Sequence, residues 1–147
     1  MIKQQPITPE VLARLPDLVE TLRACDSVQA LFFFGGLAEG KLQPLSDLDL
    51  AVLVRPGKVG DELFDLQLEL IGIVSQQLKC EEFDLVVLNL APMRFAYQIL
   101  KQGWLIFVKD LEELVDFRER VVKRYLDFAH YRKSFDRVFM QGLGLHG

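Results

Sequence analysis

Apolar residues gather in four short runs along this chain, and each run has the composition of a strand. The runs cover residues 28–34, 47–54, 83–90 and 104–108 and are rich in Val, Leu, Ile and Phe. In the first three the apolar residues are almost continuous, which is typical of strands buried on both faces. Trp104, at the start of the fourth run, is expected in the core. The pattern therefore predicts a small, largely buried sheet.

The segments around these runs carry apolar residues at helical spacing. The predicted helices cover residues 8–25, 60–78, 92–102 and 110–140. Thr8 and Asp110 are expected to cap the first and the last of them, and Pro16 is expected to divide or kink the first. The order of elements predicts an α/β or α+β fold, a layered domain with helices against a small sheet.

Length and composition place the chain among globular proteins. With 147 residues, half of them apolar, it is expected to form one domain over residues 1–147. No apolar run approaches the roughly 18 residues of a membrane-spanning helix, and no export signal is apparent, so a cytoplasmic protein is expected. Cys25 and Cys80 stand apart from each other and from the histidines, which favours ordinary thiols over a disulfide or zinc site.

Charge is distributed unevenly along the chain. The formal net charge is -4, which disfavours a protein that coats nucleic acid. Residues 118–137 nevertheless hold seven Lys or Arg and three Asp or Glu. An acidic body thus carries a basic C-terminal segment. No aromatic stacking motif accompanies that charge in the sequence, so direct DNA binding is not expected.

Three aspartates stand at the beginnings of two predicted strands. Asp47 and Asp49 flank one leucine, and because side chains alternate along a strand, both carboxylates leave the same face. Asp84 opens the next apolar run in a similar position. Like charges at the mouth of a buried strand repel, and a divalent cation with oxygen ligands neutralises them. Three such acids suit the Mg²⁺ ions of a phosphoryl displacement, whereas solvated strand-end aspartates are the plain alternative.

A glycine pair follows the first predicted strand. Gly35 and Gly36 allow the backbone to turn with φ > 0 and to present N–H groups to an anion at close range. A triphosphate fits such a loop. A simple turn between two strands explains the same pair, so the two interpretations stay open on this segment alone.

Taken together, these segments resemble the minimal nucleotidyltransferases of the polymerase-beta-like superfamily. The family signature is Gly-Ser, ten residues, then Asp-x-Asp, and Gly35-Gly36 stands at the same spacing from Asp47-Leu48-Asp49. The segment 83–92 looks like the strand that carries the family's third carboxylate. Residues 98–103 and 124–128 are similar to small members that serve as antitoxins.

The resemblance implies a mixed sheet flanked by helices, two Mg²⁺ ions, and ATP as the nucleotide. It implies catalytic and metal-binding roles for Asp47, Asp49 and Asp84, and nucleotide contacts at Gly35, Gly36 and Ser46. In the antitoxin branch it implies transfer of AMP from ATP to a tyrosine hydroxyl of a partner HEPN toxin. One position departs from the signature: Gly36 replaces its serine, so a hydroxyl is lost and reduced or altered activity is expected.

Two other functions stay open beside this one. A catalytically impaired antitoxin would neutralise its partner by binding alone. A nucleotidyltransferase of this family could also act on a small molecule, although a chain this short has few extra walls to surround such an acceptor.

The last predicted helix carries a long apolar stripe. Its members recur at three- and four-residue steps, interrupted by Arg132, and are Val121, Tyr125, Phe128, Phe135 and Phe139. Core packing is the ordinary explanation for such a stripe. The alternative is that the basic distal part docks a partner subunit, either the toxin or another copy of the chain.

Overall fold

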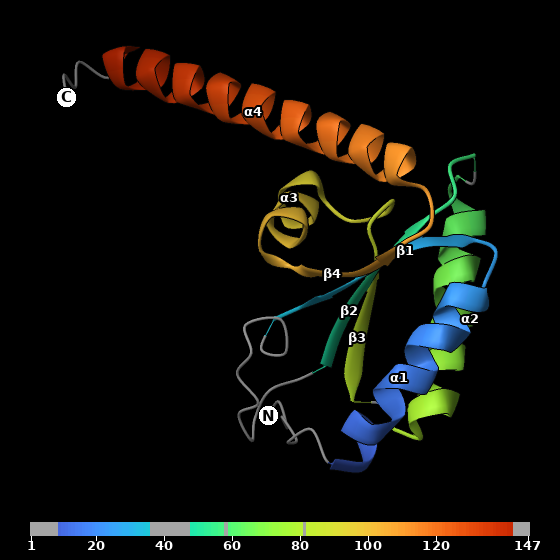
Figure 1. The fold of residues 1–147 in the computed structure, drawn as a ribbon. Coiled ribbons are helices and arrows are strands. Elements are labelled where there is room, and N and C mark those ends of the chain that lie inside the picture. The colour runs from blue at the N-terminus through green and yellow to red at the C-terminus, as the bar shows by residue number, and fades with distance from the viewer. Residues whose placement is uncertain (1–8, 36–47, 58, 81, 143–147) are drawn as a thin grey trace.

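The chain folds into a four-stranded sheet with helices on both faces (Figure 1). The computed structural model describes residues 9–35, 48–57, 59–80 and 82–142. The elements in these ranges are α1 (Pro9–Ala24), β1 (Val28–Phe34), β2 (Leu48–Val54), α2 (Asp61–Leu78), β3 (Phe83–Val87), α3 (Met93–Gln102), β4 (Trp104–Val108) and α4 (Leu111–Gly142). Their order is the predicted one.

The sheet is mixed, with strand order β3-β2-β1-β4. β2 and β3 are parallel and connected through α2, whereas β1 is antiparallel to both β2 and β4. In the two central strands every residue is buried except Phe34 and Asp49, which are half-buried. This confirms the prediction of doubly buried strands from continuous apolar runs.

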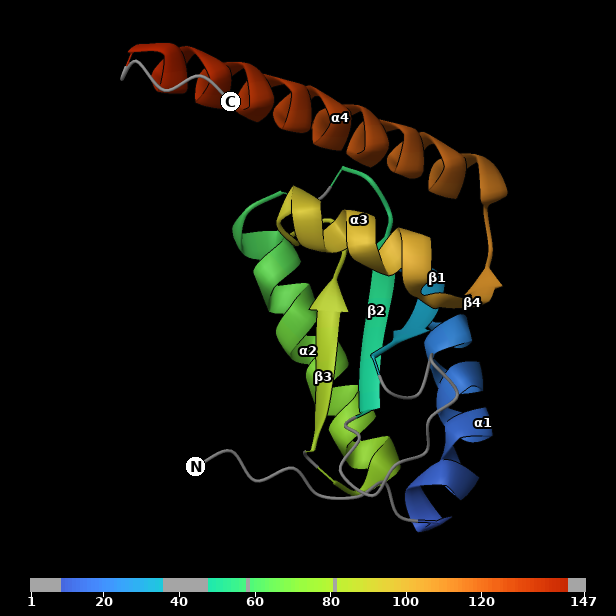
Figure 2. The ribbon, with the colours of Figure 1, turned by 90° about the vertical axis from the view of Figure 1, so that its left-hand side faces the viewer.

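Each face of the sheet has its own core (Figures 1 and 2). Helices α1 and α2 cover the face to which Leu50 and Val52 belong. Helices α3 and α4 cover the opposite face, to which Ala51 and Leu53 belong. Full burial of a Val or Leu side chain is worth about 1.5–3 kcal/mol, so both helical layers contribute to holding the sheet.

Strand β3 ends at Val87, three residues before the predicted end. The difference comes from Asn89, whose side chain takes the place of a further strand residue beside Val54. Its Oδ1 accepts a hydrogen bond from the Val54 backbone N–H at 2.9 Å, and its Nδ2 donates one to the Val54 carbonyl at 3.1 Å. Backbone pairing is thus replaced by a side-chain amide at this edge.

Replacing Asn89 with Ala is expected to lower the free energy of unfolding by about 1–3 kcal/mol, because both Val54 groups lose a partner in a partly buried place. Urea denaturation measures the change. Asn89→Asp, which places a charged acceptor oxygen against the Val54 carbonyl in place of the donor, should lose at least as much stability as Asn89→Ala. Gln76→Ala, at an exposed position of α2, should change the free energy by less than about 0.5 kcal/mol. Equal stability of Asn89→Ala and Gln76→Ala would contradict this account.

The expectation for Trp104 is wrong, and of the two effects expected of Pro16 the division of the first helix does not occur, because α1 runs through Pro16. A proline has no N–H, so the backbone carbonyl one turn earlier in the helix loses its hydrogen bond. Because Pro16 is exposed, water can bind that carbonyl instead. Trp104 is not in the core: its side chain is 50% exposed, since it begins β4, an edge strand with only one neighbour.

The last helix extends well beyond the sheet (Figures 1 and 2). Asp110 caps it as predicted, since its Oδ1 accepts a hydrogen bond from the Glu113 backbone N–H at 3.3 Å. The 32 residues of α4 correspond to about 48 Å at 1.5 Å per residue. Thr8, the predicted cap of the first helix, lies outside the described residues. None of the helices in the described ranges is long and apolar enough to cross a bilayer.

Candidate functional site

Two of the three predicted carboxylates lie side by side. Asp49 and Asp84 are the second residues of β2 and β3, and they are direct partners in the parallel register. Neighbouring strands lie about 4.8 Å apart. The residues next to them in the strands, such as Leu50 and Leu85, belong to the core under α1 and α2. Both aspartate side chains therefore point to the opposite face of the sheet, which α3 and α4 cover nearer the other end of the strands. The register thus confirms the predicted meeting of these two acids.

The third predicted carboxylate, Asp47, lies outside the described residues, as do Gly36 and Ser46. Within the described ranges, no three His, Cys, Asp or Glu side chains are grouped so that they could hold a metal ion. The roles of these residues therefore stay predictions. Asp49 is half-buried and Asp84 is exposed, so the pair stands where the buried sheet meets solvent.

Gly35 brings the end of β1 against Asp49. Its φ is +71°, as predicted for a glycine turn, and a Cβ built on it would overlap Oδ2 of Asp49. The preceding residue, Phe34, is the register partner of Asp49 in the antiparallel pair. Only a residue without a side chain permits this approach of backbone to carboxylate. Gly35, Asp49 and Asp84 therefore form one continuous patch.

A cavity of about 190 Å³ opens directly beside this patch, between the end of β1 and one face of α3. Its walls are Phe34, Gly35, Phe95, Gln98, Ile99, Gln102 and Gly103. Sequence reasoning missed the α3 residues. The signal available was the helical spacing of Phe95, Gln98 and Gln102, which places them on one face of the helix, although nothing local indicates that this face borders the acids.

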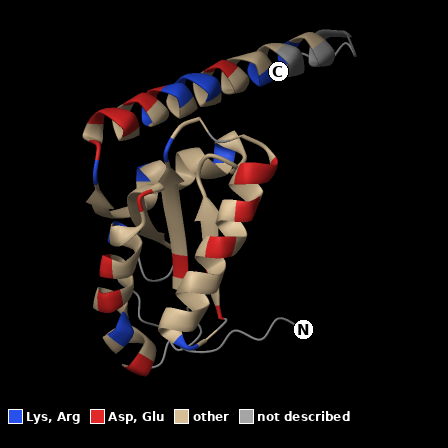
Figure 3. Cartoon of the chain, turned by 90° about the vertical axis from the view of Figure 1, so that its right-hand side faces the viewer, with Lys and Arg blue, Asp and Glu red and all other residues tan. Residues whose placement is uncertain are grey.

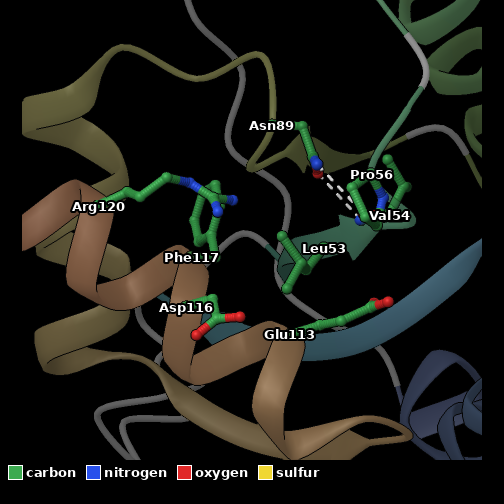
Figure 4. A pocket seen from close by; sticks show the side chains of 8 residues that line it. All are labelled: Leu53, Val54, Pro56, Asn89, Glu113, Asp116, Phe117 and Arg120. Atoms are coloured by element: carbon green, nitrogen blue, oxygen red, sulfur yellow. Dashed lines mark hydrogen bonds between the residues drawn. The ribbon is translucent and has the colours of Figure 1, made fainter.

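A second, smaller cavity of about 80 Å³ lies at the other end of β2 (Figure 4). Acidic Glu113 and Asp116, basic Arg120 and the amide of Asn89 line it, together with Leu53, Val54, Pro56 and Phe117. From Asp49 to Val54 the strand rises about 16 Å, so this cavity is remote from the predicted acids. One carboxylate oxygen, Oε2 of Glu113, is buried and has no hydrogen-bond partner within the described part of the chain. A few water molecules fit here, but a nucleotide does not.

A thiol lies on the face of the sheet opposite the acids. Cys25 packs against the α1–α2 core, and its Sγ donates a hydrogen bond to the Thr21 carbonyl at 3.4 Å. Burial raises the pKa of Cys25, and the positive charge of Lys109 partly offsets that effect. A protonated thiol on the far face has no part in the candidate site, in agreement with the sequence interpretation.

The apolar stripe of α4 divides into two parts. Val121 is buried in the α3–α4 core, and Tyr125 stacks on Tyr97 of α3 with ring centroids 4.0 Å apart. Phe128 is 49% exposed, and most of the described residues after it are exposed as well. Core packing thus explains the stripe only to Tyr125. The side chains of Phe135 and Phe139 lie outside the described ones.

A basic and aromatic hollow follows where the packing ends. It measures about 200 Å³ and is lined by Arg94, Tyr125, Phe128, Ala129, Arg132 and Lys133. In Figure 3 the first turns of α4 are coloured as acidic residues, and further along the helix basic residues are interspersed with acidic ones. Of the two aromatic rings in this lining, that of Tyr125 is stacked on Tyr97 and that of Phe128 is exposed.

Comparison with known proteins supports the fold. The family model described as Polymerase beta, Nucleotidyltransferase matches residues 17–112. Among proteins with curated descriptions, none matches this chain.

Several solved structures share the fold. One is a toxin–antitoxin complex with AMP-PNP, at 20% identity and a TM-score of 0.64, covering 90% of this chain and 99% of that one. Another is the tri-AMPylated Shewanella oneidensis HEPN toxin in complex with the MNT antitoxin, at 19% identity and a TM-score of 0.62, covering 88% and 98%. The toxin–antitoxin pair MntA–HepT matches at 20% identity and a TM-score of 0.61, covering 88% and 98%. These matches confirm the predicted mixed sheet with flanking helices.

Proposed function

The chain belongs to the polymerase beta nucleotidyltransferase family, and on that premise we propose that it transfers AMP from ATP to a hydroxyl group. The acceptor is a tyrosine of a partner HEPN toxin, so the protein is the antitoxin of a toxin–antitoxin pair. The observation that carries the proposal is the adjacency of Asp49 and Asp84 beside the backbone of Gly35. Support for the partner comes from the similar structures, which are toxin–antitoxin complexes.

The donor set of this patch fits Mg²⁺. Asp49 and Asp84 are carboxylates on adjacent positions of one sheet face, and hard cations take such oxygen ligands together with phosphate oxygens. With Asp47, which lies two residues before Asp49 in the sequence, the three would hold two ions. When bound, the ions would supply charge neutralisation for the attacking and leaving oxygens.

The transfer is an in-line displacement at the α-phosphorus of ATP. A bond forms between the acceptor oxygen and that phosphorus, the bond to the bridging oxygen breaks, and pyrophosphate leaves with the electron pair. The acceptor hydroxyl loses its proton, for which the exposed carboxylate of Asp84 is the acceptor. Gly35 and Gly36 would seat the β- and γ-phosphates with backbone N–H groups, and Ser46 would add a polar contact.

The surface for the partner is the distal part of α4 together with the hollow against α3. Phe128 and Tyr131 are exposed there, and exposed apolar side chains rimmed by polar ones are typical of interaction surfaces. Arg94, Arg132 and Lys133 surround the hollow, and none of the described residues that line it is acidic. An acidic segment of the toxin with an apolar anchor complements this surface.

Incubation with α-labelled ATP, Mg²⁺ and the HEPN partner tests the enzymatic claim. Label on the partner, lost when a tyrosine of the partner is replaced by Phe, is the expected result. Absence of transfer by the wild-type protein would defeat the claim of catalysis.

Charge reversal on α4 tests the partner surface. Arg132→Glu combined with Lys133→Glu is expected to weaken toxin binding by about 100-fold, because like charges at an interface cost several kcal/mol. Calorimetric titration of the partner measures the change. Lys79→Glu, at an exposed position after α2 on the other side of the molecule, is the matched control and should bind as wild type. Unchanged binding of the double variant would rule out this surface.

The same variants separate catalysis from binding alone. If the chain only binds its partner, neutralisation of toxicity in cells survives Asp49→Asn but not the α4 charge reversal. If it acts as an enzyme, both changes abolish neutralisation.

A further inference from the structure

Helix α4 carries a second apolar stripe, on a side of the helix that does not face the sheet. Its members recur at steps of four or seven residues, which places them on one side of a helix. They are Leu111, Val115, Val122 and Leu126, called the outer stripe below. The two leucines are 62% and 57% exposed, and Val115 is 42% exposed. The α3–α4 core takes other residues of this helix, such as Leu114 and Val121.

An open groove of about 620 Å³ follows the outer stripe, and all the described residues that line it belong to α4. Val115, Val122 and Leu126 form its apolar part, with charged side chains beside them. Figures 1 and 2 show α4 lying across one end of the molecule. The groove shares no lining residue with the basic hollow between α3 and α4. It is therefore a separate surface from the one proposed for the toxin.

The spacing of the outer stripe is symmetric about its centre. From either end it begins with a leucine, followed four residues further in by a valine. Two such helices laid antiparallel about the midpoint of residues 118 and 119 therefore place leucine level with leucine and valine level with valine. A two-fold axis relates the two copies, as in the interfaces of symmetric homodimers. The stripe is thus complementary to itself over residues 111–126, about 24 Å of helix.

The charges of α4 also favour an antiparallel pair. Residues 111–118 hold three acidic side chains and one basic one, and residues 119–126 hold three basic and one acidic. An antiparallel pair sets each half of this segment against the opposite half, so the net charges attract. A parallel pair would set like charges together.

One set of charged residues borders the outer stripe along the same side. Glu112, Asp116 and Lys123 are exposed, and their steps of four and seven residues place them on one side of the helix. In the antiparallel pair Lys123 of one copy lies level with residue 114 of the other. It therefore lies between Glu112 and Asp116 of that copy.

We propose that the outer stripe binds the outer stripe of a second copy of this chain, so that the protein forms a two-fold dimer through antiparallel α4 helices. Apolar side chains at the centre and charged ones at the rim are the usual arrangement of an interface. The proposal uses none of the residues assigned to toxin binding, and it does not depend on the transfer reaction.

Sedimentation velocity of the protein alone, over a series of concentrations, tests the dimer. The wild type is expected to change from monomer to dimer as the concentration rises, because a contact between two short helical stripes is small. Val115→Glu combined with Leu126→Glu should weaken dimerisation by about 100-fold, since it places carboxylates against the apolar side chains of the other copy. Leu68→Glu, at a leucine of α2 that is 54% exposed, is the matched control and should dimerise as wild type. Thermal unfolding checks that each variant retains the fold.

An exchange of charges tests the antiparallel orientation. Lys123→Glu and Glu112→Lys, made in separate proteins, should each weaken self-association by about 10-fold, because each brings like charges together at both ends of the symmetric contact. An equal mixture of the two variants should associate more tightly than either variant alone. In the mixed pair the introduced carboxylate of one protein faces the introduced ammonium group of the other.

Three results would overturn the proposal. The first is a wild type that stays monomeric at every concentration, and the second is a dimer that Val115→Glu/Leu126→Glu leaves intact. The third is a mixture of the charge variants that associates no better than its components, which would exclude the antiparallel contact. If the wild type is monomeric and the double variant loses toxin binding, the outer stripe binds the toxin instead. AMP transfer by a monomeric protein would leave the proposed function intact.

Discussion

Asp49→Asn is expected to reduce AMP transfer by about 10³-fold or more without a comparable loss of stability. Asparagine has nearly the same shape as aspartate, so it fits beside the Gly35 backbone as the carboxylate does. The substitution removes one negatively charged ligand of the metal ions. Metal assistance stabilises the transition state by several kcal/mol, and each 1.36 kcal/mol corresponds to a tenfold change in rate. Asp84→Asn is expected to reduce transfer as well, because Asp84 is both the proposed proton acceptor and the metal ligand next to Asp49.

The measurement is the initial rate of label transfer to the partner, beside thermal unfolding of each variant. Asp65→Asn, at an exposed position of α2, is the matched control and should transfer at the wild-type rate. Transfer by Asp49→Asn within tenfold of wild type would show that the carboxylate patch is not the reaction centre.

Gly35→Ala is the second change with a large expected effect, and it acts through geometry instead of charge. Alanine at φ +71° is strained, and its Cβ would overlap Oδ2 of Asp49. Either the carboxylate or the turn must move. A shift of about 1 Å at a catalytic group costs about 10²-fold in rate, and the strained backbone should lower the free energy of unfolding by about 1–3 kcal/mol.

Gly57→Ala separates the two contributions. Gly57 also has a positive φ, +104°, but no atom lies within 4 Å of the Cβ that alanine would add there. This variant should lose stability to a similar extent and keep its transfer rate. If Gly35→Ala transfers AMP at the same rate as Gly57→Ala, the close approach of Gly35 to Asp49 has no catalytic importance.

The sequence predicted the helices and strands better than the contacts between them. Continuous apolar runs identify β1 and β2 because both of their faces are covered. The shorter β3 and the exposed Trp104 escape local reasoning, because they depend on a distant amide at Asn89 and on the edge position of β4.

The candidate site shows the same division. Alternation along a strand shows only that the side chain of Asp49 points away from the face of Leu48 and Leu50. It does not show which other strand or helix lies next to Asp49. That Asp84 is its register partner depends on the parallel pairing of β2 with β3, which no local pattern specifies. The α3 wall of the cavity is a further step removed, since it requires knowing which helix face meets the end of β1.

Beyond Tyr125, α4 contributes no buried side chain to the core among the described residues, so packing stabilises this stretch little. Its helical hydrogen bonds can therefore open one turn at a time without unfolding the sheet. Amide protons in this stretch should exchange with deuterium much faster than those of β1 and β2, and proteases should cut here first. Under the proposed function, a bound toxin would slow both processes, so the protein would survive longer in the complex than alone.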